Sequence, residues 1–139
     1  MSTILVVDDE LTVRSLLHDI LDLEGYVVRE AEDGPAALFD MHTKTPDLVI
    51  LDVMMPRMSG IEVLKEIRQD VELARVPVLM LTAAGDDDTT WAGWSSGAST
   101  YLNKPFDHDQ LLSWVERLLT PPDTTIVAEK PVYQLATTV

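Results

Sequence analysis

The stretch LVILDVMMP (Leu48–Pro56) contains the feature that decides the fold. Its first four residues, Leu48 to Leu51, are all apolar, which predicts a strand buried on both faces, as in a parallel sheet. Asp52 follows directly, and a carboxylate at the end of such a strand is costly to bury unless another group pairs with it. Asp52 therefore needs a partner, and the rest of the sequence supplies candidates.

Short apolar runs and helical patterns alternate along the chain. Besides Leu48–Leu51, strands are predicted at Ile4–Val7, Tyr26–Arg29, Val78–Leu81 and Thr100–Asn103. Helices are predicted at Leu11–Leu23, at Ala36–His42, from Gly60 through Ile67, around Thr89–Ser96, and after the cap residue Asp107 to Leu119. Five strands that alternate with five helices predict an α/β fold, a doubly wound parallel sheet with helices on both faces. The flavodoxin-like strand order for such a sheet is 2-1-3-4-5.

The composition excludes several classes of function. The 139 residues contain no cysteine, so disulfides and thiolate chemistry are ruled out. The net charge is −14, with scattered basic residues, and this argues against binding of nucleic acid by this chain itself. No apolar stretch approaches the roughly 20 residues of a membrane helix, and no secretory signal is visible, so we expect a cytoplasmic protein without membrane contact.

The chain divides near residue 120. Residues 1–120 contain the whole alternating pattern and predict one domain. The sequence TPPDTT (Thr120–Thr125) has the composition of a linker. Residues 121–139 are a tail, a single added strand, or the start of an output domain that is absent here, and the sequence leaves these alternatives open.

Polar side chains gather at the carboxyl ends of the predicted strands. Asp8 and Asp9 follow the first strand, Asp52 the third, Thr82 the fourth and Lys104 the fifth. In an open parallel sheet, ligands bind in the crevice beyond these ends, where the strand order reverses. Three carboxylates that share one crevice repel each other, and a divalent cation relieves that repulsion. Oxygen ligands favour Mg²⁺, with Mn²⁺ as a plausible substitute.

These residue types suit phosphoryl transfer. A carboxylate screened by a metal ion is a competent nucleophile toward phosphorus, and its product is an aspartyl phosphate. The transferred group spreads negative charge over three oxygens. Lys104 can offer a positive charge to these oxygens, and Thr82 can offer a hydroxyl donor.

Four segments in order resemble the receiver domain of two-component response regulators. They are VVDDE (Val6–Glu10), LVILDVMMPRMSG (Leu48–Gly60), MLTA (Met80–Ala83) and YLNKPF (Tyr101–Phe106). The resemblance covers about residues 3 to 119. Each segment alone is weak, but four of them on the right elements are highly specific.

The resemblance implies roles for the clustered residues. Asp52 would be the phosphoacceptor, receiving its group from the phosphohistidine of a sensor histidine kinase or from a phosphotransfer protein. Asp8 and Asp9 would bind the metal together with Asp52, and Met54 would add its backbone carbonyl. Lys104 would pair with the phosphoryl group, and the Lys104–Pro105 bond would be cis.

The same resemblance implies a switch. Thr82 would move toward the phosphoryl group, and the ring of Tyr101 would then turn inward. This would shift the surface of the fourth helix, fifth strand and fifth helix, and so control a downstream target or an output domain of the same protein. Such a protein catalyses only its own phosphorylation and dephosphorylation. A homodimer is possible but is not predicted.

Two other functions remain as alternatives. One is a pseudo-receiver, an interaction module that works without phosphate. The other is a metal-dependent phosphohydrolase, which commonly has a second carboxylate two residues after its nucleophile, where this chain has Met54. Two local features also have two interpretations. Asp86–Asp88 either begin a helix or bind a metal, and Trp91 with Trp94 either pack in the core or form a partner surface.

Overall fold

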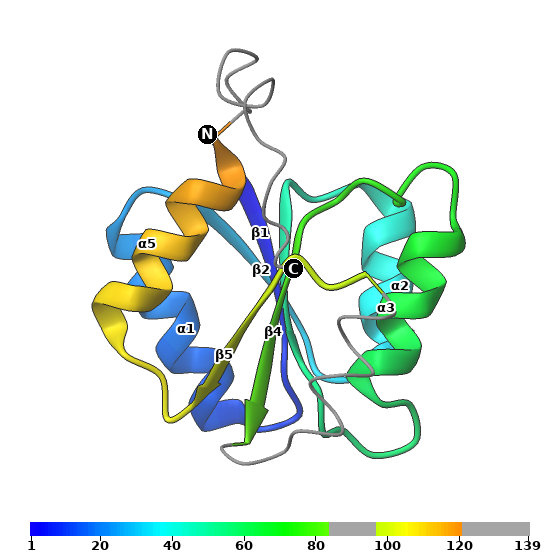
Figure 1. The fold of residues 1–139 in the computed structure, drawn as a ribbon, viewed down its shortest axis with the longest axis horizontal. Coiled ribbons are helices and arrows are strands. Elements are labelled where there is room, and N and C mark those ends of the chain that lie inside the picture. Colours follow the sequence, from blue (N-terminus) through cyan, green and yellow to red (C-terminus); the bar gives the residue numbers. More distant parts are fainter. Residues whose placement is uncertain (84–96, 121–139) are drawn as a thin grey trace, which may run out of the picture.

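Five parallel strands form the central sheet of the computed structural model, which describes residues 1–83 and 97–120 (Figure 1). The strands are β1 (Thr3–Val7), β2 (Val27–Ala31), β3 (Leu48–Asp52), β4 (Val78–Ala83) and β5 (Thr100–Lys104). Their order is β2-β1-β3-β4-β5, and every neighbouring pair is parallel. The predicted flavodoxin-like order is therefore confirmed.

Four helices cover the two faces of the sheet in the described ranges. They are α1 (Leu11–Leu23), α2 (Gly34–Thr43), α3 (Gly60–Gln69) and α5 (His108–Leu119). Figure 1 shows α1 and α5 on one side of the sheet and α2 and α3 on the other. The helix predicted around Thr89–Ser96 lies outside the described residues, as do Asp86–Asp88, Trp91, Trp94 and residues 121–139.

Three of these helices begin with an N-cap residue whose side chain accepts a hydrogen bond from the backbone. Asp33 accepts a hydrogen bond from the backbone of Ala36 at the start of α2, and Asp107 accepts one from Gln110 at the start of α5. Ser59 and Glu62 cap each other's backbone at the start of α3. These bonds satisfy amide groups that have no partner inside the helix, so the helices begin close to where the sequence predicts.

The alternation of side chains along the buried strands produces two cores. On β3, Val49 and Leu51 pack toward α2 and α3, whereas Leu48 and Ile50 pack toward α1 and α5. All four side chains are fully buried. The uninterrupted apolar run that predicted this strand is therefore explained by helices on both faces.

Three details differ from the sequence-based expectations. β2 extends to Ala31 although Glu30 interrupts its apolar pattern, because an edge strand can leave polar side chains in solvent. The strands β3, β4 and β5 include Asp52, Thr82 and Lys104 rather than ending before them. Leu16 is apolar and has the helical spacing of the buried Ile20, but it is exposed on α1.

Candidate functional site

The register of the sheet brings the ends of four strands to one edge. Val7 lies opposite Leu51, and Asp8 is the next residue after β1. Asp52 lies opposite Leu81, directly before Thr82, and Ala83 lies opposite Lys104. The topology alone therefore places Asp8, Asp52, Thr82 and Lys104 at the carboxyl edge of the sheet.

Three carboxylates meet at this edge. Oxygen atoms of Asp8, Asp9 and Asp52 all lie within 4.8 Å of one another. Asp8 is fully buried and Asp52 is 3% exposed, whereas Asp9 faces solvent. Two of the three negative charges are thus held where water screens them little.

Lys104 supplies the positive charge of the cluster. Its Nζ lies 3.1 Å from Oδ2 of Asp8, 3.2 Å from Oδ1 of Asp52 and 3.7 Å from Oε1 of Glu10. Burial opposes the charge of the ammonium group, but the carboxylates of Asp8 and Asp52 outweigh burial and raise the pKa of Lys104. Lys104 therefore stays protonated and ties β5 to the ends of β1 and β3.

The carboxyl group of Asp52 is poorly matched to its surroundings. Burial raises its pKa, the charge of Asp8 raises it further, and the result is a pKa of about 6. Lys104 and the backbone of Met54 act in the opposite direction but do not compensate. One lysine is therefore not enough to stabilise two buried carboxylates.

The donor set fits a hard divalent cation. Oδ2 of Asp8 is buried and accepts no hydrogen bond from the described part of the chain, although the Lys104 ammonium is at ion-pair distance. Oδ1 of Asp8 accepts a hydrogen bond from the backbone of Glu10, which fixes the carboxylate. A buried oxygen without a hydrogen bond, beside two further carboxylates, is a suitable ligand for Mg²⁺ or Mn²⁺.

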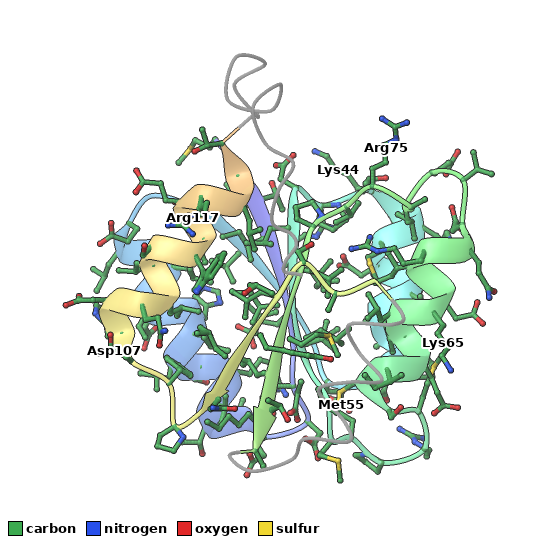
Figure 2. All side chains as sticks on the ribbon, viewed as in Figure 1. Lys44, Met55, Lys65, Arg75, Asp107 and Arg117 are labelled. Atoms are coloured by element: carbon green, nitrogen blue, oxygen red, sulfur yellow. The ribbon has the colours of Figure 1, made fainter. Side chains whose placement is uncertain are left out.

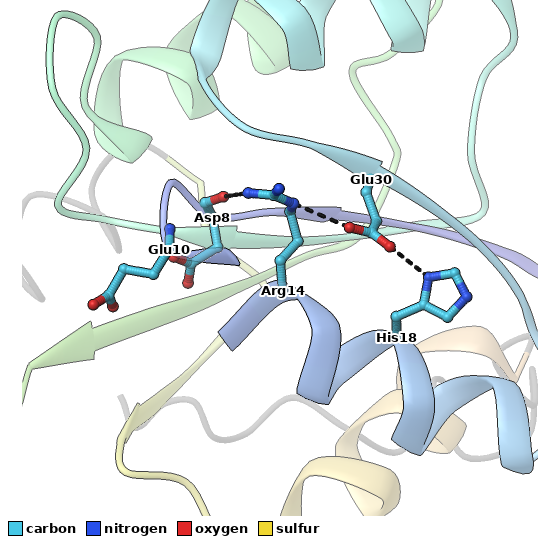
Figure 3. Close-up of polar contacts among 5 residues, drawn as sticks. All are labelled: Asp8, Glu10, Arg14, His18 and Glu30. Carbon is cyan, nitrogen blue, oxygen red and sulfur yellow. Dashed lines mark hydrogen bonds and ion pairs between the residues drawn. The ribbon is translucent and has the colours of Figure 1, made fainter. Parts of the chain in front are cut away.

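A chain of polar contacts joins the residue after β1 to α1 and β2 (Figure 3). Arg14 donates a hydrogen bond of 2.7 Å to the backbone carbonyl of Asp8 and one of 3.0 Å to Glu30. The other carboxylate oxygen of Glu30 lies 2.6 Å from Nδ1 of His18. The sequence-based interpretation missed these residues. Their signal was the i, i+4 spacing of Arg14 and His18 on one face of α1, but nothing indicated Glu30 as the partner.

Gly60 permits the close approach of α3 to Asp52. A Cβ atom at this position would overlap the backbone carbonyl of Asp52. The amide of Gly60 donates a hydrogen bond of 2.8 Å to the carbonyl of Val53, which closes the loop between β3 and α3. Glycine at this position therefore helps to hold the segment that begins at Asp52.

The remaining predicted residues surround the cluster. Thr82 is buried near the end of β4, and the Lys104–Pro105 bond is cis. Tyr101 is half-buried and packs against the core on the α2 and α3 side. The side chain of Met54 is exposed. Of the predicted set, Asp8, Asp9, Asp52 and Lys104 are brought into direct proximity.

A model of the response regulator receiver domain matches residues 4–116. The chain belongs to the response regulator receiver domain family. A receiver domain of a two-component response regulator is a signalling protein, and its general function is that of a phosphorylation switch rather than of a classical enzyme. Within the described ranges, no helix of this receiver domain has the length and apolarity needed to cross a bilayer.

Known relatives and solved structures agree with this assignment. The receiver domain is 38% identical to the DNA-binding dual master transcriptional regulator RpaA of Synechocystis, over 94% of this chain and 54% of the relative. It is 43% identical to the CpxR homolog of Haemophilus influenzae, over 86% of this chain and 51% of the relative. The chain thus spans about half the length of the curated relatives it matches.

Among solved structures, a response regulator from Chloroflexus aurantiacus is 40% identical with a TM-score of 0.82, and the match covers 85% of this chain and 97% of that one. The chemotaxis protein CheY4 of Vibrio cholerae is 35% identical with a TM-score of 0.81, over 86% and 99% of the two chains.

Proposed function

We propose that this receiver domain accepts a phosphoryl group on Asp52 from the phosphohistidine of a sensor histidine kinase or from a phosphotransfer protein. The observation that carries the proposal is the placement of Lys104, whose Nζ lies 3.1 Å from Asp8 and 3.2 Å from Asp52. A lysine that bridges two buried carboxylates can also pair with an anion attached to one of them. Family membership supports the same chemistry.

The proposed reaction is a direct displacement at phosphorus. An Oδ atom of Asp52 forms the new O–P bond, and the P–N bond to the donor imidazole breaks with its electron pair leaving on nitrogen. Lys104 offers positive charge to the phosphoryl oxygens, and the hydroxyl of Thr82 offers a hydrogen bond. Hydrolysis of the resulting aspartyl phosphate returns Asp52 to its original state.

The metal belongs to the same proposal. Asp8, Asp9, Asp52 and the backbone carbonyl of Met54 would hold Mg²⁺, and Mn²⁺ could substitute for it. When bound, the cation would neutralise part of the charge that the carboxylates and the phosphoryl oxygens bring together. The buried oxygen of Asp8 that accepts no hydrogen bond from the described residues supports this assignment.

The output is proposed from the position of the site. Thr82 and Tyr101 lie on the adjacent strands β4 and β5, and phosphorylation would shift both toward one of two existing conformations. The surface that changes would include β5, α5 and the helix predicted around Thr89–Ser96. The relative RpaA of Synechocystis is named as a DNA-binding transcriptional regulator. By analogy, the output would act through a downstream target or a DNA-binding domain of the same protein.

Labelling with a small phosphodonor tests the acceptor directly. The wild-type protein, Asp52→Asn and the control Asp19→Asn are incubated with acetyl phosphate and Mg²⁺ and analysed by intact mass. Asp19 is an exposed carboxylate on α1, so its replacement makes the same chemical change away from the site. We expect one phosphoryl group on the wild-type protein and on Asp19→Asn, and none on Asp52→Asn, because an amide cannot form the acyl phosphate.

Three results would contradict the proposal. Unchanged labelling of Asp52→Asn would remove Asp52 as the acceptor. An unlabelled wild-type protein would favour the phosphate-independent interaction module. Repeated turnover of a generic phosphoester, such as p-nitrophenyl phosphate, would favour the phosphohydrolase.

A further inference from the structure

Arg57, in the loop between β3 and α3, has an unusual backbone conformation. Its φ angle is 68°, which is the left-handed region, and among the described residues it is the one non-glycine residue with positive φ. Residues other than glycine rarely adopt this backbone region, because their Cβ atom comes too close to the following carbonyl oxygen. Such a conformation persists only where surrounding contacts hold it.

An ion pair joins Arg57, whose side chain is largely exposed, to the start of α2. Its Nη2 lies 2.7 Å from Oδ2 of Asp33. The other oxygen, Oδ1, accepts a hydrogen bond of 2.8 Å from the backbone of Ala36 and so caps α2. One carboxylate therefore begins α2 and fixes the β3–α3 loop at the same time.

A second contact joins the same two segments. Met58 packs so closely on Gly34 that a Cβ atom there would lie 2.8 Å from Sδ of Met58. The loop is thus docked on the first turn of α2 by a charged contact at Arg57 and an apolar contact at Met58.

The loop that Arg57 belongs to also carries Met54. At its start, the backbone of Val53 donates a hydrogen bond of 3.0 Å to Leu81 on β4. Arg57 and Asp33 line one hollow together with Pro56 and Asp9, so the ion pair shares this hollow with one carboxylate of the cluster. The conformation of the loop between Val53 and Arg57 is therefore set at both ends.

We propose that Arg57 is a positioning residue for the metal site, because its ion pair with Asp33 holds the β3–α3 loop in the conformation in which the Met54 carbonyl is available to a divalent cation. This inference rests on the proposed function. It assigns Arg57 and Asp33 an effect on Mg²⁺ affinity without contact to the ion.

Arg57→Ala tests the ion pair, because loss of positioning and loss of charge change the affinity for Mg²⁺ in opposite directions. The substitution removes a positive charge beside a cation site, so a purely electrostatic effect would tighten Mg²⁺ binding. Loss of the positioning contact would weaken it instead. We expect about fivefold weaker binding, somewhat less than the roughly 10–100-fold lost when a group that orients a metal ligand directly is removed. The measurement is an Mg²⁺ titration of the full chain followed by amide chemical shifts.

Matched variants separate positioning from charge and from folding. Arg75→Ala makes the same change in net charge at an exposed arginine that projects from the loop after α3 (Figure 2), and we expect wild-type affinity. Arg57→Lys should restore most of the affinity, because it keeps the charge that Asp33 needs. Arg57→Gly should bind at least as tightly as Arg57→Ala, because glycine adopts a φ of 68° without steric cost.

The partner variant completes the test. Asp33→Asn keeps an oxygen that can cap α2 but loses the ion pair, so it should weaken Mg²⁺ binding about as much as Arg57→Ala. The double variant should bind no more weakly than either single variant, because both remove the same contact. Circular dichroism of each variant reports whether α2 and the fold are retained.

Several outcomes would overturn the inference. Unchanged or tighter binding by Arg57→Ala, an additive loss in the double variant, or weaker binding by Arg57→Gly than by Arg57→Ala would each do so while leaving the metal site in place. Absence of Mg²⁺ binding by the wild-type protein would overturn the metal site itself and this inference with it.

Discussion

Burial and the neighbouring charge of Asp8 both disfavour the ionised form of Asp52. Its side chain is almost completely buried beside Asp8, and the single ammonium of Lys104 is shared between the two carboxylates. The resulting pKa of about 6 means that the folded protein binds a proton at Asp52 more tightly than the unfolded chain does. In the absence of a metal ion, ionised Asp52 therefore destabilises the fold.

This destabilisation predicts how stability changes with pH. Because the pKa of Asp52 is raised in the folded state, its ionisation lowers the free energy of unfolding as pH rises from about 4 to about 6. A shift of about two pKa units corresponds to at most about 3 kcal/mol. Without divalent ions, Asp52→Asn should thus be more stable than the wild-type protein at pH 7.5, and the difference should narrow toward pH 5. Urea unfolding of both proteins in a chelator measures this, and a difference that does not vary with pH would contradict the prediction.

At the scale of elements, an ion pair joins α2 and α3 at their C-terminal ends. Nε2 of His42, on α2, lies 2.7 Å from Oδ2 of Asp70, which follows α3. The hydrogen bond between them raises the pKa of His42 and lowers the pKa of Asp70. Both shifts mean that the charged pair is favoured in the folded state. The pair thus stabilises the packing of these helices only in a limited range of pH.

The pH range in which the pair stabilises the protein follows from the directions of the two pKa shifts. The contribution of His42 is present below about pH 6.5 and is lost as pH rises through its raised pKa. The contribution of Asp70 is present above about pH 4 and is lost as pH falls through its lowered pKa. His42→Gln should therefore destabilise the protein more at pH 6 than at pH 8.5. Thermal unfolding of both proteins at the two pH values tests this, and an equal loss of stability at both pH values would contradict the prediction.

At the scale of the whole molecule, the fold concentrates negative charge at one edge of the sheet. The net charge is −14, and three carboxylates converge where β1 and β3 end. A cation that binds the folded state but not the unfolded chain stabilises the protein by mass action. The stability of the whole domain should therefore report occupancy of the site.

Mg²⁺ should raise the unfolding temperature of the wild-type protein at pH 7.5 by more than NaCl of equal ionic strength. Salt screens the general repulsion, whereas a bound dication acts at the cluster. Asp9→Asn should lose this excess and still fold, because Asp9 is exposed. Differential scanning calorimetry provides the measurement, and an equal response of the two proteins to Mg²⁺ would remove Asp9 from the metal site.

The spacing of apolar residues along the sequence was sufficient to predict most of the helices and strands. The stripe of apolar residues predicted α1 at Leu11–Leu23 with its observed bounds, and Asp107 was identified as the cap of α5. Pattern failed where tertiary contacts override it. Leu16 has the spacing of an inner residue but is exposed on α1, and β2 includes the polar Glu30 because it lies at the sheet edge. The alternation of side chains does not reveal which strand has a neighbour on only one side.

The sequence by itself determined the class of fold and the identity of the clustered residues, because a parallel sheet places the ends of its strands at one edge and the motifs VVDDE and YLNKPF lie at those ends. Only the tertiary structure decided how these groups are supported. Arg14 reaches the Asp8 carbonyl, and Arg57 reaches Asp33 from a left-handed turn. Charged side chains that cross between loops follow no local periodicity, since their partners are chosen by the packing of distant segments.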